Sequence, residues 1–275
     1  MTHQSAADVF EDKLADWRAW AEAPWGQIRF AVVEETLRRQ VAELGGGPLR
    51  ILDVGGGDGR DAVPLAVAGH HVTIVDPAPG WLAEAQRRAT EAGVTDRIET
   101  VSGSLDDLAA TDGLASDFDL VLCHFVLHYR SPGPADLVRL AARVRPGGRV
   151  SVMAPNPEGR VVMALTRRGP AAALAELEAD TMPSHAFDHT ARKIDAEDMA
   201  AELASAGLRV VHRYGARIAN DFLADDRLKQ DATYFADLAR LELALCDREP
   251  FLRMGGMWQL VAEKPDASVP RTGHP

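Results

Sequence analysis

Residues 49–59 read LRILDVGGGDG, and this stretch decides the fold. A short apolar run such as the one at 51–54, closed by glycines, is typical of a strand that is buried on both faces of a parallel sheet. The glycines follow the carboxyl end of that strand, where a tight turn needs positive φ and a ligand must come close to the backbone. The stretch therefore predicts the first strand of a parallel sheet, with a ligand-binding loop at its end.

Strand-like and helix-like segments alternate along the rest of the chain. The strand-like stretches lie at 51–54, 70–76, 98–103, 118–127, 149–155, 208–218 and 256–264, and the helix-like ones at 60–68, 80–92, 134–144 and 195–206. Such alternation is the pattern of right-handed β-α-β units, in which helices cover both faces of one sheet. We expect an α/β fold with a doubly wound, mostly parallel seven-stranded sheet.

The regions outside this alternation indicate how the chain is divided. Apolar residues recur at helical steps near the N-terminus, and Pro24 and Gly26 split that region into two helices. Trp17, Trp20 and Trp25 either roof a ligand or belong to the core, and their helical spacing favours the core for two of the three. The expected organisation is a helical lid at 1–47, a main domain at 48–265 with inserted helical caps at 157–193 and 219–250, and a disordered tail at 266–275.

The overall charge limits the classes of partner. The 275 residues carry 30 Lys and Arg against 41 Asp and Glu, a formal net charge of -11 that disfavours a strongly electrostatic nucleic-acid binder. Cys123 and Cys246 have no metal-ligand spacing, and no window resembles a signal peptide or a membrane span. We expect a cytoplasmic protein, monomeric or homodimeric, with a small-molecule partner and no membrane contact.

The glycine loop has the spacing GxGxG at 55–59, and its neighbours indicate the ligand. Arg60 stands where a dinucleotide fingerprint has its last glycine. A pyrophosphate is held by loop amides and a helix N-terminus, and the acids Asp53 and Asp58 would oppose it. A cationic ligand without phosphate groups fits these residues better.

Further acids follow the next two strands. Asp76 comes about twenty residues after the glycines, where a carboxylate accepts hydrogen bonds from both hydroxyls of a ribose; capping the next helix is its alternative role. Asp106 or Asp107, after the third strand, either receives the amino group of an adenine or caps a turn. Together these acids are consistent with a bound nucleoside.

These motifs resemble those of the class I S-adenosylmethionine-dependent methyltransferases over residues 48–155. The matching segments are LDVGGGDG at 52–59, VTIVD at 72–76, FDLVLCHFVLHY at 118–129 and VRPGGRVSV at 144–152. The resemblance implies a Rossmann-like methyltransferase fold and S-adenosyl-L-methionine as the cofactor. It also implies that His124 lines the methyl site and that the cofactor is bound by Asp53, Gly55, Gly57, Asp76, Leu105, Asp106 and His124.

A closer likeness covers nearly the whole chain and points to the tRNA 5-carboxymethoxyuridine methyltransferases. The matches include WGQIR at 25–29, CHFVLHY at 123–129, NPEG at 156–159 and LELALCDREPF at 241–251. The resemblance implies that Arg29 binds the cofactor's carboxylate. Two features differ: this chain has MPSHAFDHTARK at 182–193 where those enzymes have a lysine-rich run, and Gly256 where they have an arginine.

Two histidines are the candidate catalytic residues. His124 and His128 lie at the end of the fourth strand, at the sheet edge where open α/β sheets bind ligands. Histidine is the natural base near neutral pH for a phenol, alcohol or ammonium acceptor, whereas a carboxylate acceptor needs no base. His124 could instead pack against the cofactor. His185 and His189 have no further ligand nearby, so we expect no metal site.

The leading hypothesis is an enzyme that transfers a methyl group from S-adenosylmethionine to an oxygen of a small molecule, either a hydroxyl or a carboxylate. The alternative is a tRNA wobble-uridine carboxyl methyltransferase, whose charge requirement the acidic balance disfavours. A non-catalytic cofactor-binding module is less consistent with an intact glycine loop, Asp76 and Arg29. A nicotinamide-dependent dehydrogenase ranks last, because the third glycine of its fingerprint is missing.

Overall fold

The computed structural model describes residues 14–109, 114–183 and 190–266. Seven strands form one sheet in the order β3-β2-β1-β4-β5-β9-β8, and β9 runs antiparallel to its neighbours β5 and β8. The strands are β1 Arg50–Val54, β2 His71–Asp76, β3 Ile98–Ser102, β4 Phe118–His124, β5 Val144–Pro155, β8 Arg209–Ala216 and β9 Met257–Glu263. The predicted fold class is confirmed.

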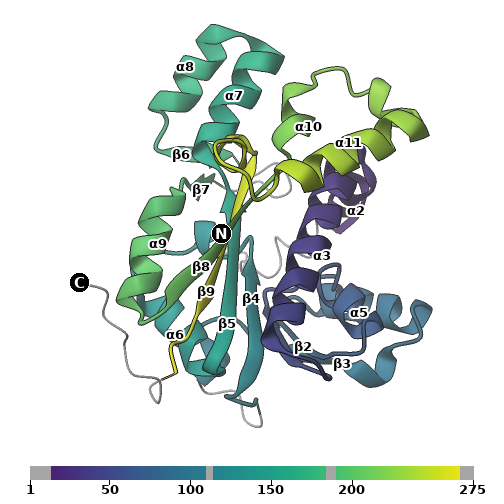
Figure 1. Ribbon diagram of the computed structural model, residues 1–275, viewed down its shortest axis with the longest axis vertical. Helices are drawn as coiled ribbons and strands as arrows, with labels where there is room; N and C mark the ends of the chain where they lie inside the picture. The colour runs from purple at the N-terminus through teal and green to yellow at the C-terminus, as the bar shows by residue number, and fades with distance from the viewer. Residues whose placement is uncertain (1–13, 110–113, 184–189, 267–275) are drawn as a thin grey trace, which may run out of the picture.

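Helices cover both faces of this sheet (Figure 1). They are α3 Pro24–Leu44, α4 Ala62–Val67 and α5 Pro79–Glu91 on one face, and α6 Ala135–Arg143 and α9 Ala196–Ser205 on the other. Neighbouring residues of β1 show why: Ile51 packs with the first group of helices and Leu52 with the second, because successive side chains of a strand point to opposite faces. Both positions must therefore be apolar.

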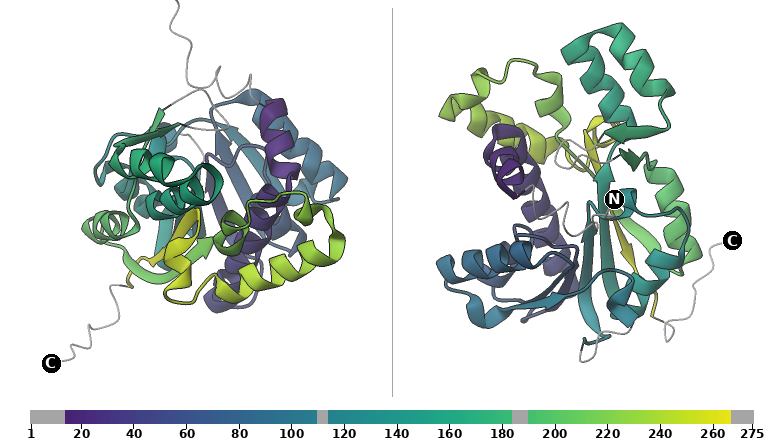
Figure 2. Two further views of the ribbon diagram at one scale, coloured as in Figure 1. Left: turned by 90° about the horizontal axis from the view of Figure 1, so that it is seen from above. Right: turned by 180° about the vertical axis from the view of Figure 1, so that it is seen from behind.

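Further helices stand beyond the carboxyl ends of β4 and β5. They belong to the two segments expected as inserted caps: α7 Pro157–Arg168, α8 Pro170–Glu178, α10 Ile218–Phe222 and α11 Ala232–Leu245, with the hairpin β6 Thr181–Pro183 and β7 Thr190–Arg192. Both pairs of helices lie at the same end of the molecule, as the view from behind also shows (Figure 2). Because β1 runs parallel to β4, the glycine loop leaves the sheet at this same edge. No helix within the described residues has the length and apolar character needed to cross a membrane.

The N-terminal region forms α2 Leu14–Glu22 and α3, which are separated at Ala23. Pro24 begins α3, where its missing N–H costs no helical hydrogen bond. The expected break at Gly26 is wrong, because Gly26 lies inside α3. A Cβ there would come 2.4 Å from the carbonyl oxygen of Trp20, so glycine is needed where α2 and α3 approach each other.

The fourth strand ends earlier than its apolar sequence suggests. The run at 118–127 predicts a strand through Leu127, but β4 ends at His124 because Phe125 has φ 60°. A bulky residue rarely adopts this conformation, and such strain concentrates at functional sites. The chain then turns through a 3₁₀ helix at Leu127–Tyr129, which places His128 away from the sheet's alternation.

Candidate functional site

The glycine loop leaves β1 in a conformation that favours glycine at two predicted cofactor positions. Gly55 has φ 71° and Gly57 has φ 53°. A Cβ on Gly55 would lie 2.4 Å from Cγ2 of Val126, and one on Gly57 would lie 3.0 Å from the ring of Trp81. The loop is thus a tight cradle between the end of β4 and the start of α5, in which side chains have no space.

Asp76 lies beside this loop at the carboxyl end of β2. Its Oδ2 accepts a hydrogen bond from the backbone N–H of Gly57 at 3.0 Å, and its Oδ1 accepts one from the N–H of Ala78 at 2.9 Å. Each oxygen keeps a further lone pair for a ligand hydroxyl. Burial raises the pKa of Asp76 to about 6. The geometry is compatible with both expected roles of Asp76. Its carboxylate stabilises the turn through two backbone N–H groups, and it can still accept hydrogen bonds from ribose hydroxyls.

The other two loop acids are buried and contribute little charge to the loop. Asp53 is 2% exposed, its Oδ2 has no hydrogen-bond partner, and burial raises its pKa well above the usual range. Asp58 is equally buried and pairs with Arg60 at 3.1 Å and with Arg88 at 3.3 Å. The expectation that Asp58 lends negative charge to the ligand is therefore wrong, because two arginines neutralise it.

Arg29, the residue expected to bind a carboxylate, is held by an acid that the sequence reasoning missed. Its Nη1 and Nη2 donate to Oδ1 and Oδ2 of Asp61 at 2.6 and 2.9 Å. Burial alone would raise the pKa of Asp61, but the charge of Arg29 and a hydrogen bond from His124 lower it below its usual range. A buried arginine requires an acid partner, but the sequence around Arg29 does not indicate which acid it is.

His124 stands in the middle of a buried chain of hydrogen bonds. Its Nδ1 lies 2.8 Å from Oδ2 of Asp61, and its Nε2 lies 2.9 Å from Oγ of Ser151. Gln259 donates its Nε2–H to the same Oγ, and the Oγ1 of Thr36 donates to Oε1 of Gln259. Because the Asp61 carboxylate can only accept hydrogen bonds, Nδ1 of His124 carries a hydrogen and donates it to Asp61.

His128, the second predicted catalytic residue, is 4% exposed rather than solvated. Its Nδ1 is buried and has no hydrogen-bond partner. Burial, with a smaller contribution from the charge of Arg192, lowers the pKa of His128 to about 3. Arg192 donates its Nε–H to the carbonyl oxygen of Leu127 at 3.3 Å, and among the described residues no acid pairs with its guanidinium. A neutral histidine and an unpaired cation thus lie side by side.

The turn after β3 contains the candidate adenine-side residues. Leu105 is buried. Asp106 is exposed and forms hydrogen bonds of 2.7 and 2.8 Å with Arg130. Asp107 accepts from both the N–H and the hydroxyl of Ser104, which makes it the residue that caps this turn. Of the two acids, Asp106 is the one paired with an arginine, and Arg130 also forms hydrogen bonds with Asp136.

Aromatic side chains cover the loop from the N-terminal side. Trp17 stacks on Trp20 with ring centroids 5.0 Å apart and lies 5.7 Å from Trp81, the residue that contacts Gly57. The expectation that two of the three N-terminal tryptophans belong to the core holds for one of them: Trp17, Trp20 and Trp25 are all half-buried, and of the three Trp20 packs against the core. Helix α2 thus contacts α5, the helix that follows Asp76, through Trp17 and Trp81.

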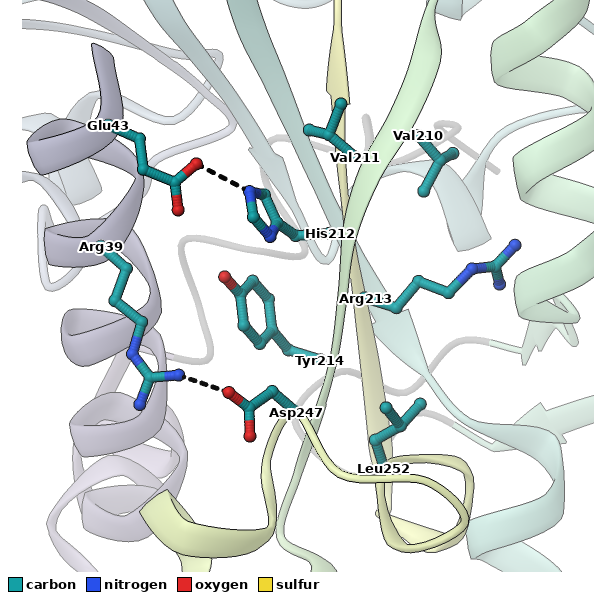
Figure 3. A pocket seen from close by; sticks show the side chains of 9 residues that line it. All are labelled: Arg39, Glu43, Val210, Val211, His212, Arg213, Tyr214, Asp247 and Leu252. Atoms are coloured by element: carbon teal, nitrogen blue, oxygen red, sulfur yellow. Dashed lines mark hydrogen bonds and ion pairs between the residues drawn. The ribbon is translucent and has the colours of Figure 1, made fainter. Parts of the chain in front are cut away.

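A groove of about 470 Å³ lies elsewhere, between α3 and β8 (Figure 3). His212 and Tyr214 project from β8 toward Arg39 and Glu43 of α3. Its charges are internally matched, since Glu43 pairs with His212 at 2.9 Å and Arg39 with Asp247 at 2.8 Å. Three strands separate β8 from β1, so this groove is not part of the loop site.

The described residues fit the cofactor that the resemblance implies. The Nε–H of Arg29 is buried without a partner, as a donor awaiting a carboxylate would be. Gly55 and Gly57 give the loop a positive-φ backbone with no Cβ atoms, and Asp76 offers oxygens to hydroxyl groups. His185 and His189 lie outside the described residues.

Comparisons with known proteins indicate a methyltransferase domain. Residues 51–148 match a family model described as a methyltransferase domain. The tRNA 5-carboxymethoxyuridine methyltransferase of Escherichia coli K12 is 28% identical over 242 residues, which cover 88% of this chain and 90% of that protein. A ubiquinone biosynthesis O-methyltransferase of Xanthomonas axonopodis is 33% identical over 150 residues, 54% of this chain and 59% of that protein.

Among solved structures, the magnesium protoporphyrin IX methyltransferase of Synechocystis with bound S-adenosylhomocysteine superposes with a TM-score of 0.61. The alignment covers 94% of this chain and 97% of that one at 18% identity. At this identity the likeness concerns the fold alone.

Proposed function

We propose that this chain, which is an S-adenosylmethionine-dependent methyltransferase, methylates a carboxylate oxygen of a small-molecule acid. When bound, the cofactor supplies an electrophilic methyl group. The protein's share of such a displacement is to align the acceptor oxygen and to exclude water. The observation that carries the proposal is that neither predicted catalytic histidine is available as a base.

Both nitrogens of His124 are committed, one to Asp61 and one to Ser151. The pKa of about 3 leaves His128 uncharged and weakly basic at neutral pH. An alcohol or phenol acceptor requires removal of a proton, which a base with such a pKa accomplishes poorly. A carboxylate is already ionised and needs only to be positioned, so it is the acceptor that these histidines best serve.

Arg192 is the residue that would hold this acceptor. Its guanidinium lies beside His128, is anchored by one hydrogen bond to Leu127, and has no acid partner among residues 14–109, 114–183 and 190–266. A guanidinium can bind a carboxylate through two parallel hydrogen bonds. The Nδ1 of His128, buried and without a hydrogen-bond partner, is a further polar atom in the segment to which Arg192 is anchored.

The charge of the caps favours a small acid over RNA. Many basic side chains of the two caps, and Arg217 next to the second one, are paired with an acid in the caps: Arg160 and Lys193 with Glu176, Arg167 and Lys229 with Asp226, Arg217 with Asp221, and Arg227 with Asp225. Phosphate binding relies on basic groups that are free to replace counterions. Together with the net charge of -11, these pairs leave only weak electrostatic attraction for RNA.

We also propose that the protein is located in the cytoplasm.

The second candidate is the wobble uridine of tRNA, because the E. coli relatives with that name match over 88% of this chain. The acceptor named there, 5-carboxymethoxyuridine, also carries a carboxylate. The proposed reaction, methylation of a carboxylate oxygen, is therefore the same for both acceptors. A small-molecule acid and a tRNA differ in size and charge.

The two candidates are separated by one assay. The purified protein is incubated with methyl-labelled S-adenosylmethionine and either a small-molecule extract or tRNA that carries unmethylated 5-carboxymethoxyuridine. The proposal predicts label in the small-molecule fraction, absent with Asp76→Ala. Label in nuclease-sensitive tRNA would select the second candidate. A protein that binds S-adenosylhomocysteine and labels neither fraction would contradict both.

A further inference from the structure

We propose that Asp61 and Arg29 form one receptor for the amino-acid end of the cofactor, in which Asp61 binds the α-ammonium group and Arg29 the α-carboxylate. The role of Arg29 follows from the family resemblance, whereas that of Asp61 rests on its contacts here. The inference concerns cofactor binding and does not depend on which acceptor is methylated.

The hydrogen-bond count leaves one position open on Asp61. An ionised carboxylate has about four lone-pair sites. Arg29 uses one on Oδ1 and one on Oδ2, and His124 uses the second one on Oδ2. The remaining lone pair belongs to Oδ1. An ammonium group carries donors only, and it can complete this set.

The exposed fractions of the three side chains also indicate that Asp61 has an open position. The Asp61 side chain is 10% exposed, whereas those of Arg29 and His124 are 4% exposed. Because its partners enclose the carboxylate, the accessible part of Asp61 lies on the side they leave free. Arg29 keeps an unpartnered Nε–H. An acceptor position and a donor position are thus available in adjacent side chains.

The charge balance of the pair matches a zwitterion. Arg29 is cationic and Asp61 is anionic, so the ion pair itself carries no net charge. An α-ammonium group brought next to Arg29 alone would meet a like charge in a poorly solvated place. Asp61 provides the opposite charge, and the cofactor's carboxylate in turn faces the guanidinium.

The chain of hydrogen bonds behind Asp61 explains its fixed orientation. His124 is anchored through Ser151 and Gln259, which come from the neighbouring strands β5 and β9. A carboxylate held in this way loses little conformational freedom when the ligand arrives. In this account His124 is a positioning residue for Asp61.

The test compares two ligands by calorimetry: S-adenosylhomocysteine and an analogue in which hydrogen replaces the α-amino group. The wild type is expected to bind the first at least about tenfold more tightly, as for a charged hydrogen bond. Asp61→Asn is expected to reduce that preference to about threefold or less. The decarboxylated analogue, which keeps the ammonium group, is expected to lose affinity for Asp61→Asn as well.

Equal binding of the two ligands by the wild type would overturn the proposal without any variant. A purely structural role would also be visible, because Asp61→Asn would then weaken both ligands equally and leave the preference intact. Glu176→Gln is the matched control, since Glu176 is a carboxylate in a buried pair with Arg160. A reduced preference in this variant would contradict the assignment, and thermal melting of each variant verifies that it is folded.

Discussion

Arg29 and Asp61 join helix α3 to the segment that follows the glycine loop, through a bidentate ion pair of 2.6 and 2.9 Å. The same carboxylate forms a hydrogen bond with His124, which lies at the end of β4. The pair therefore fixes the N-terminal helices, the loop and the methyl-site strand relative to one another. The relative positions of three segments that are far apart in the sequence thus depend on the carboxylate of Asp61.

Arg29→Met is expected to lower the free energy of unfolding by about 3 to 5 kcal/mol, because removing one partner leaves the other charge buried without compensation. Urea denaturation measures this change. Arg38→Met is the control in the same helix, since Arg38 forms an exposed pair with Glu35 and its loss should have no measurable effect. Equal stability of the two variants would show that Asp61 is solvated.

Gly55→Ala is expected to weaken binding of S-adenosylhomocysteine at least about tenfold, a loss of about 1.4 kcal/mol. A Cβ there meets Val126 at 2.4 Å and displaces the loop. Gly93→Ala is a matched control: Gly93 has φ 70° against 71° for Gly55, with nothing within 4 Å of its Cβ position. Both variants should lose about 1 to 2 kcal/mol of stability from the left-handed backbone, but only the first should lose affinity.

Cofactor affinity is expected to depend on the ionisation of Asp76. The ionised carboxylate is the better acceptor for ribose hydroxyls, so affinity should rise with pH through the pKa of about 6. Stability should change in the opposite direction. Burial raises the folded-state pKa of Asp76 above the ordinary carboxyl value of 3.8, so this group contributes stability below pH 3.8 that is lost as pH rises to about 6. Calorimetry from about pH 5 to pH 8 measures the first effect, and Asp76→Asn should abolish its pH dependence. Unchanged pH dependence in Asp76→Asn would exclude Asp76 as its origin.

The turnover number with a carboxylate acceptor is expected to be independent of pH between about 6.5 and 8.5, with both substrates saturating. The reason is that His128, with a pKa of about 3, undergoes no titration there. His128→Gln should keep at least about a tenth of the turnover number, since no proton is removed. A loss of activity on the acidic side of this range that disappears in His128→Gln would identify His128 as a base.

Sequence patterns predicted the parts of the molecule that depend on local chemistry. Apolar runs and their glycines predicted the strands, and Gly55, Gly57 and Asp76 meet in one loop as expected. The position of His124 at a strand end was also predicted. These features depend on backbone geometry and on the alternation of side chains, which a single sequence reports directly.

The rest depended on contacts between distant segments. Asp61 is separated from Arg29 by 32 positions, and no local pattern indicates that they form a pair. The burial of His128 follows from Phe125, whose positive φ ends β4 and starts the 3₁₀ turn. The prediction that Asp58 lends charge to the ligand is wrong for the same reason, because Asp58 is paired with Arg88 of helix α5. Charge in a buried site is therefore set by tertiary pairing.

The stability of the transferred methyl group to mild alkali tests the central claim most directly. A methyl ester is hydrolysed by mild base and releases methanol, whereas a methyl ether or methylamine is not. The account predicts that label from S-adenosylmethionine, once transferred by this protein, becomes volatile after alkali treatment. Label that stays on an alkali-stable product would show that the acceptor is a hydroxyl or an amine, and would contradict a carboxylate acceptor.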